Sequence, residues 1–150
     1  MAAAQSKTAP TYRLDFTVTE RGERSTTARQ YMMLVESGHK GKINTSLRVP
    51  TYLANSNKEV HTLAVGEILE CSVAEVEAGI SLDCGFEVSG IAPVQPTRSR
   101  DSWFPPVMRS SQVFTTVILP LDKATTLAFL DDPVTNKRVE VNVTARRFSE

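Results

Sequence analysis

The sequence has little of several residue types on which common functions depend. Its 150 residues include two cysteines, two histidines and one tryptophan. His39 and His61 stand apart without ligand-like spacing, so no metal site is expected. Lysine plus arginine and aspartate plus glutamate each number 17, and the formal net charge is zero. A neutral chain lacks the general attraction to polyanions, so we expect no nucleic-acid partner.

Motifs that carry catalysis are also missing. The sequence has no Gly-x-Ser-x-Gly elbow, no phosphate-binding loop of the Walker type and no His-Glu-x-x-His. No run of about 18 apolar residues is present, so no transmembrane helix is predicted. Asp131 and Asp132 precede Pro133, which is ordinary turn chemistry rather than a calcium loop. We therefore predict a protein that is not an enzyme, with no catalytic residues, no metal and no cofactor.

The composition indicates a globular protein, with 41% hydrophobic and 23% charged residues. A chain of this length buries about 68–70% of its surface and supports one domain. We assign residues 12–150 to a single β-rich domain and residues 1–11 to a flexible tail. The run Ala2-Ala3-Ala4 is typical of the small-residue stub beside a signal-peptidase cut, so we expect an exported protein.

Alternation of apolar and polar residues predicts an all-β fold. The fold class is an antiparallel β-sandwich or folded sheet of about eight to nine strands. The expected strands are residues 12–19, 28–35, 43–49, 59–64, 67–76, 79–89, 107–119, 125–130 and 138–145. The segment 12–19 follows a free tail and is expected at a sheet edge, whereas 28–35 is apolar on both faces and is expected to be central. The mixed faces of 107–119 predict a bulge.

The two cysteines lie on a predicted hairpin. If Glu77 and Ala78 form a two-residue loop, Cys71 faces Cys84, and the apolar residues of both strands share one face. A slip by one residue would place apolar side chains opposite polar ones, so the hydrophobic pattern selects this register. Opposed cysteines of this kind have Cβ atoms about 4.5–5.5 Å apart, which permits a disulfide with some adjustment. Two buried free thiols remain the alternative.

A proline-rich segment, residues 92–106, holds the one tryptophan. Its candidate interaction residues, together with a nearby arginine, are Arg98, Arg100, Trp103, Phe104 and Arg109. Aromatic and arginine side chains dominate protein interfaces, so this loop is a candidate binding surface. The alternative is that the aromatic residues fold back and cap an open end of the sandwich.

Four ordered pieces of the sequence resemble the C-terminal β-domain of bacterial secretins, which are outer-membrane ring proteins of secretion systems and type IV pili. The pieces are Arg48-Val49-Pro50, Val65-Gly66-Glu67-Ile68-Leu69-Glu70-Cys71-Ser72-Val73, Ser81-Leu82-Asp83-Cys84-Gly85-Phe86-Glu87-Val88-Ser89 and Pro106-Val107-Met108-Arg109. The Gly-rich stretch and the Val-Pro…Leu-Gly-Asp-x-Pro segment of secretins have no counterpart here. The resemblance therefore implies a detached, single-domain relative with a secretin-type sheet.

The resemblance also implies a function. We expect a non-catalytic module of the bacterial cell envelope, periplasmic or associated with the outer membrane, that acts through protein partners and forms a homo-oligomer. A different class of function is a periplasmic or surface domain that binds a glycan or peptide with the Trp103 loop.

Overall fold

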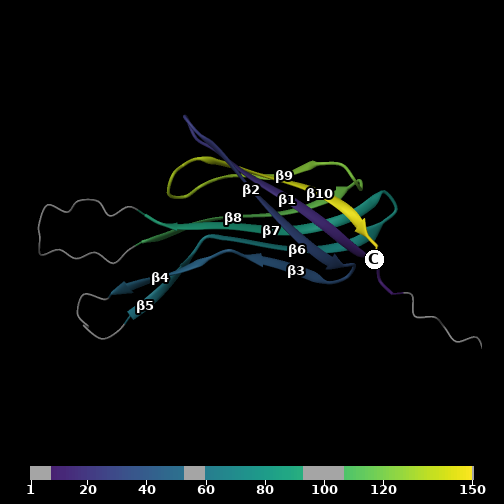
Figure 1. The fold of residues 1–150 in the computed structure, drawn as a ribbon, viewed down its shortest axis with the longest axis horizontal. Coiled ribbons are helices and arrows are strands. Elements are labelled where there is room, and N and C mark those ends of the chain that lie inside the picture. Colours follow the sequence, from purple (N-terminus) through teal and green to yellow (C-terminus); the bar gives the residue numbers. More distant parts are fainter. Residues whose placement is uncertain (1–7, 53–59, 93–106, 150) are drawn as a thin grey trace, which may run out of the picture.

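The computed structural model describes residues 8–52, 60–92 and 107–149, which form ten strands (Figure 1). The strands are β1 (Thr11–Arg21), β2 (Thr26–Glu36), β3 (Lys40–Asn44), β4 (Leu47–Tyr52), β5 (Val60–Val65), β6 (Glu67–Val76), β7 (Gly79–Ile91), β8 (Met108–Leu119), β9 (Thr125–Asp131) and β10 (Arg138–Phe148). All strand pairs are antiparallel, so the all-β prediction is confirmed.

The strands form two four-stranded sheets and one two-stranded ribbon. The β1 sheet has the order β2-β1-β10-β9, and the β7 sheet has the order β3-β6-β7-β8. The ribbon consists of β4 and β5 and projects from the β7 sheet (Figure 1). The two larger sheets lie one over the other, and the strands of the β1 sheet cross those of the β7 sheet at an angle.

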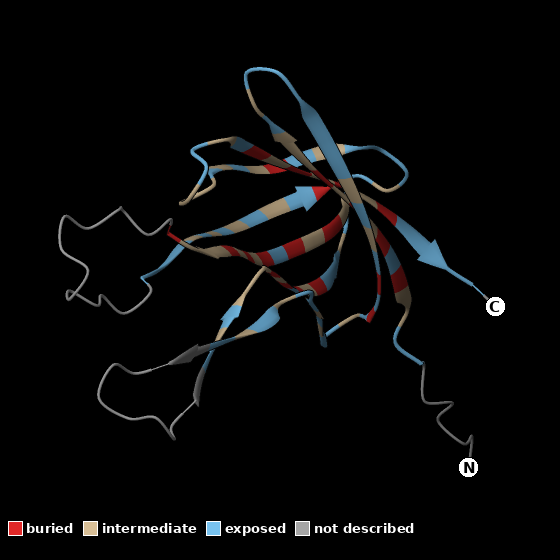
Figure 2. Ribbon diagram, turned by 60° about the vertical axis from the view of Figure 1, so that its left-hand side comes forward, coloured by how far each residue is buried: buried red, intermediate tan, exposed pale blue. Residues whose placement is uncertain are grey.

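Both sheets contribute their inner faces to one hydrophobic core. Alternate residues of β1 point inward, as do alternate residues of β6, β7 and β10, so buried and exposed bands alternate along the strands in Figure 2. The largest fully buried side chains are Tyr12, Phe16, Leu14, Ile80, Leu82, Leu119 and Val18. The core therefore joins the N-terminal strand to the hairpin in the middle of the chain.

Two predictions about strand position are wrong. The strand expected at an edge, β1, lies between β2 and β10 and pairs with both along its whole length. The strand expected to be central, β2, is an edge strand. Its second apolar face consists of Met32 and Leu34, which are 54% and 47% exposed. Apolar residues on both faces therefore indicated an exposed patch rather than burial on both sides.

The strand count exceeds the prediction because one predicted strand is divided. Residues 43–49 were expected as a continuous strand, but the structure ends β3 at Asn44 and begins β4 at Leu47. Gly66 lies opposite the break, with φ of 144°, and a Cβ atom there would lie 2.7 Å from the Ser46 Cα. A backbone approach this close requires glycine. The long hairpin therefore bends where the ribbon leaves the sheet.

The ribbon also departs from the predicted end of the strand. Pro50 was expected to end it, but β4 continues through Pro50 to Tyr52. In the described chain β4 pairs with β5 on one side alone, so a residue without an N–H group is accommodated on the other side. None of the described side chains of the ribbon is buried.

The predicted bulge lies in a different strand. The pairing of β8 with β7 is continuous from Ile80 opposite Leu119 to Ile91 opposite Met108. The register shift lies between β9 and β10: Val141 and Asn142 pair with Ala128 and Thr126, so Leu127 of β9 is the extra residue. The mixed faces of β8 have another cause: Phe114 and Ile118 point to the outer face and are exposed.

Candidate functional site

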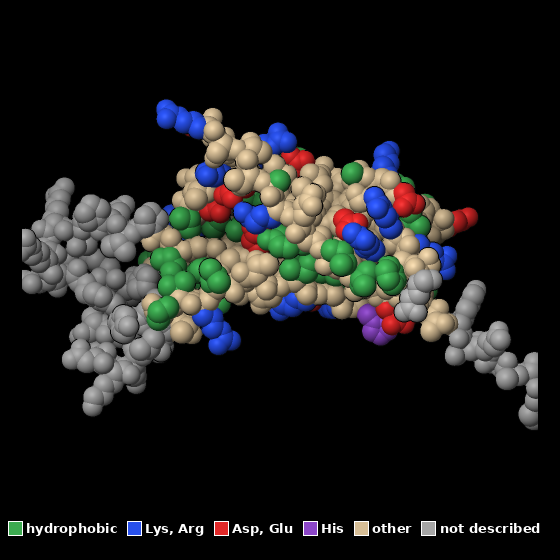
Figure 3. Space-filling view, in the orientation of Figure 1, with side chains coloured by type: hydrophobic (Ala, Val, Ile, Leu, Met, Phe, Trp, Pro, Cys, Tyr) green, Lys and Arg blue, Asp and Glu red, His purple; other side chains and the backbone are tan. Residues whose placement is uncertain are grey.

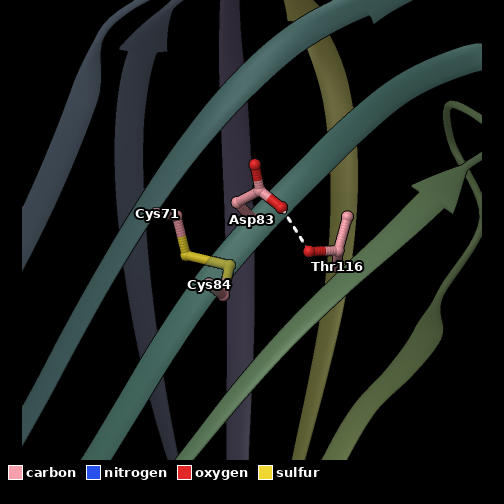
Figure 4. The surroundings of a disulfide bond; sticks show 4 residues. All are labelled: Cys71, Asp83, Cys84 and Thr116. Carbon is pink, nitrogen blue, oxygen red and sulfur yellow. Dashed lines mark hydrogen bonds between the residues drawn. A yellow bond between two sulfur atoms is a disulfide. The ribbon is translucent and has the colours of Figure 1, made fainter.

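The cysteine hairpin has the predicted register. Cys71 of β6 faces Cys84 of β7, and the same register extends from Glu67 to Val88. The two sulfur atoms form a disulfide, the state that the sequence pattern left open, and the Cα atoms lie 4.2 Å apart (Figure 4). Both cysteines are buried in the core. The bond therefore joins the two central strands of the β7 sheet beneath its outer face.

A polar cluster connects the two sheets near the root of the ribbon. Glu67, the first residue of β6, is 8% exposed and is the buried charged residue of the described chain. Arg29 of β2 donates hydrogen bonds to both Glu67 carboxylate oxygens, through Nη2 to Oε1 and through Nε to Oε2 at 3.3 Å. The Tyr31 hydroxyl donates to Oε2 at 2.7 Å, and Arg29 also lies 3.7 Å from Glu20. We call these residues the inter-sheet clasp.

The clasp shifts the pKa values of Arg29 and Tyr31. Burial raises the pKa of the Tyr31 hydroxyl, and the hydrogen bond to Glu67 and the charge of that carboxylate raise it further. Burial lowers the pKa of Arg29, but the hydrogen bond to Glu67 and its charge outweigh burial and raise it overall. The Glu67 carbonyl also accepts hydrogen bonds from the Thr45 amide at 2.9 Å and the Thr45 hydroxyl at 3.1 Å. The bend of the hairpin is thus tied to β2.

Each sheet has two edges, and the edges of the two sheets lie side by side. On one flank of the molecule β2 lies next to β3, and on the opposite flank β9 lies next to β8. Among the described strands no backbone ladder connects the sheets across either flank. Because neighbouring strands alternate in direction, β2 runs opposite to β9, and β3 runs opposite to β8. Four edges with unpaired backbone groups are therefore available.

Exposed apolar side chains accompany these edges. Met32 and Leu34 lie on the outer face of β2, Phe114 and Ile118 on that of β8, and Phe129 on β9. Figure 3 shows hydrophobic side chains gathered in a band over β3 and β4. Exposed apolar edges of this kind favour pairing with another chain.

Most of the predicted interaction loop lies outside the described residues. Arg98, Arg100, Trp103 and Phe104 belong to that part. Arg109 is exposed near the start of β8, opposite Gly90 of β7. Within the described ranges no group of acidic, histidine and cysteine side chains is arranged to hold a metal ion. No helix in the same ranges is long and apolar enough to span a membrane.

The sequence did not predict the inter-sheet clasp or the way in which the edges of the two sheets lie side by side. Arg29, Tyr31 and Glu67 are far apart in the sequence, and no local spacing connects them. One feature of the sequence pointed to Glu67: it is an acidic residue that shares the alternating positions of Leu69 and Cys71, which face the core. The pairing of edges depends on strand order, which local patterns do not contain.

No family model and no curated protein matches this sequence. Solved structures do match. The secretin domain β-barrel of InvG from the Salmonella SPI-1 injectisome superimposes with a TM-score of 0.66 at 8% identity over 95% of this chain and 64% of that one. PulD of the Klebsiella pneumoniae type II secretion system outer membrane complex has a TM-score of 0.61 at 9% sequence identity, and the match covers 95% of this chain and 41% of PulD. The type II secretin GspD of E. coli K12 has a TM-score of 0.59 at 11% sequence identity, and the match covers 95% of this chain and 51% of GspD.

The protein therefore has the fold of secretin domains, as the resemblance in its sequence implied. It is similar to a part of each of these secretins, because the matched region spans less than two thirds of their chains.

Proposed function

We propose that this protein is a non-catalytic structural module of the bacterial cell envelope that assembles edge to edge with copies of itself. The observation that carries the proposal is the matching of its flanks. A copy placed alongside presents β2 and β3 to the β9 and β8 of its neighbour, and both new pairs are antiparallel. Each sheet has an even number of strands, so this pairing repeats with every added copy.

The edges also offer apolar contacts for such an assembly. The edges that pair in this assembly carry Met32 and Leu34 on β2 and Phe129 on β9, and these side chains are exposed to water. A head-to-tail interface that repeats with a fixed rotation generates a closed ring or a filament. The solved secretin structures with this fold come from an injectisome and from an outer membrane complex, which supports an assembly role in the envelope.

The disulfide supports an exported location. Disulfides persist in oxidising compartments such as the bacterial periplasm and are rare in the cytosol. The bond between Cys71 and Cys84 is buried in the core beneath the β7 sheet. We therefore place the protein in the periplasm or at the outer membrane.

Blocking one edge tests the proposal. Cys71 and Cys84 have the short Cα separation of a pair without mutual backbone hydrogen bonds, so Cys84 bonds Thr115 of β8 instead. The N–H groups of Gln112 and Thr116 then point away from β7, toward the free edge. Proline at Gln112 removes a donor at the edge while leaving the ladder to β7 intact.

We expect the wild type to elute as an oligomer in size exclusion with light scattering at micromolar concentration, and the Q112P variant to elute as a monomer. Gln30→Ala, an exposed substitution that leaves every backbone donor in place, is the matched control and should remain oligomeric. Circular dichroism establishes that Q112P is folded. Edge pairing would be contradicted by a wild type that stays monomeric when its concentration is raised about tenfold. It would also be contradicted by a Q112P variant that is as oligomeric as the wild type.

A further inference from the structure

The outer face of the β7 sheet contains an open trough of about 420 Å³. The assembly proposed above pairs the backbone groups at the sheet edges, whereas the trough is formed by side chains on the outer face. It is lined by residues from all four strands of that sheet: Lys40, Ile68, Glu70, Ser72, Asp83, Gly85, Glu87, Gln112, Phe114 and Thr116 among them. A hollow of this size that is open along one side admits an extended polypeptide segment.

The pairing registers place the side chains of the trough in three rows across the strands. The central row holds Phe114, Gly85 and Glu70, and it ends at Lys42. Gly85 has no side chain, so the Phe114 ring lies over it: a Cβ atom at Gly85 would be 3.0 Å from the ring. The ring is nevertheless 79% exposed, so one of its faces is free for a ligand.

Three carboxylates share the outer face with this aromatic ring. Asp83 and Glu87 lie two residues to either side of Gly85 on β7, and Glu70 lies across from it on β6. The Thr116 hydroxyl donates a hydrogen bond to Asp83, as Figure 4 shows, and this contact orients the carboxylate on the outer face. Two lysines of β3 lie near Glu70: Lys40, whose Nζ is 3.8 Å from a Glu70 carboxylate oxygen, and Lys42, which is opposite Glu70 in the register. They offset the charge of Glu70 and leave Asp83 and Glu87 as the carboxylates further along the face. Among the described residues Asp83 and Glu87 form no ion pair.

We propose that this trough binds an extended, arginine- or lysine-bearing segment of a partner polypeptide. The excess of carboxylates over lysine attracts cationic side chains and repels acidic ones. The free face of Phe114 adds a cation–π contact, which a guanidinium makes by stacking on the ring. A strand lying along β7 would place side chains i and i+4 toward Asp83 and Glu87, because these carboxylates are four residues apart on the same face of β7. Side chain i+2 would then lie over Gly85.

Isothermal titration with synthetic peptides tests the proposal on the full chain. The probe is a capped peptide of about eight residues in which arginine alternates with threonine, long enough to span the sheet. Peptides of the same length with lysine or glutamate in place of arginine are compared with it. We expect micromolar binding of the arginine peptide, weaker binding of the lysine peptide, no binding of the glutamate peptide, and weakening at higher ionic strength.

Variants assign the binding to the trough. Phe114→Ser should weaken it about 3- to 30-fold, and Glu87→Gln and Asp83→Asn about two- to fivefold each. Phe148→Ser and Glu36→Gln change an exposed phenylalanine and an exposed glutamate elsewhere and are the matched controls. Because Phe114 covers Gly85, Phe114→Leu keeps the cover without the aromatic ring and should also weaken binding.

Several results would overturn the proposal: equal binding of the glutamate peptide, no detectable binding of the arginine peptide, or an affinity that Phe114→Ser leaves unchanged. Tighter binding of a neutral cell-wall oligosaccharide than of the arginine peptide would assign the trough to a glycan instead. Because Gln112 itself lines the trough, Q112P is left out of the titration, and light scattering of the titrated wild type reports edge pairing separately from peptide binding.

Discussion

The two sheets are alike on their inner faces and different on their outer faces. Both bury alternating apolar residues in one core, with Phe16 in the β1 sheet and Phe86 in the β7 sheet at 1% and 4% exposure. Outside, the β1 sheet has Thr17 opposite Asn142 at its centre and exposed apolar residues on its edge strands, such as Phe129 of β9. The outer face of the β7 sheet differs because it has a hollow lined by Phe114 and by carboxylates. The buried apolar side chains therefore lie on the faces that the sheets share, and the binding that we propose uses a face by which they differ.

The largest effect should come from the shared face. Replacing Phe16 or Phe86 by alanine should each destabilise the protein by about 3–5 kcal/mol, since each removes a buried aromatic ring and leaves a cavity. Chemical denaturation followed by circular dichroism measures the loss. Two separate transitions, or a large loss in one variant alone, would show that the sheets do not share one cooperative core.

Removing the disulfide should act on the β7 sheet. The bond closes a loop with a sequence separation of 13, and restricting the unfolded chain in this way stabilises by about 3 kcal/mol. The double variant with alanine at Cys71 and Cys84 should lose about that amount in the same denaturation experiment. Adding reductant to the wild type should reproduce the loss, and reductant should leave the double variant unchanged. A difference below about 0.5 kcal/mol would show that the bond contributes little.

Breaking the inter-sheet clasp should have a smaller effect. Arg29→Met leaves the Glu67 carboxylate nearly buried with Tyr31 as a remaining donor, which costs about 1–3 kcal/mol. The double variant Arg29→Met with Glu67→Leu should recover part of the loss, because no unpaired charge remains. Arg13→Met, which removes an exposed ion pair with Asp15, is the control and should change stability by less than 1 kcal/mol, about the limit for exposed pairs. Equal losses in Arg29→Met and Arg13→Met would exclude a structural role for the clasp.

The clasp should also make stability depend on alkaline pH. The pKa of Tyr31 is raised in the folded protein above its ordinary value of 10.0, so the folded protein holds the phenol proton more tightly than the unfolded chain does. This contribution is fully present below pH 10 and is lost as the pH rises through the folded pKa. Thermal denaturation above pH 10 should show a decline that is shallower in Tyr31→Phe. The same decline in both proteins would assign it to other groups, of which Tyr12 is one, because burial also raises its pKa.

The smallest effect on stability should come from the outer face. Phe114 is the same residue type as Phe86 in the same sheet, but it is exposed. Phe114→Ala should therefore lower the free energy of unfolding by about 1 kcal/mol or less, because the Phe114 side chain buries little apolar area. The contact that is lost is that of the ring with Gly85. Chemical denaturation of Phe114→Ala beside Phe86→Ala gives the comparison directly. A loss as large as that of Phe86→Ala would place Phe114 in the structural core and would weaken the trough as a binding surface.

Local pattern predicted the hairpin of Cys71 and Cys84 correctly because a register shift reverses every side chain. The same reasoning failed for β1 and β2, since a strand's place in a sheet depends on which other strands compete for its edges. Met32 and Leu34 illustrate the point: their alternation with Met33 and Val35 is visible in the sequence, but only the sheet order reveals that one face lies open at an edge.

What the sequence by itself determined is the all-β class, the strand segments, the cysteine register and the resemblance to secretin domains, because each depends on residues close together in the chain or in fixed order. Only the tertiary structure decided which strands are edges, where Arg29 meets Glu67, and that Phe114 stands among three carboxylates. These features join residues up to tens of positions apart, and chain geometry brings such residues together through the burial of the common core.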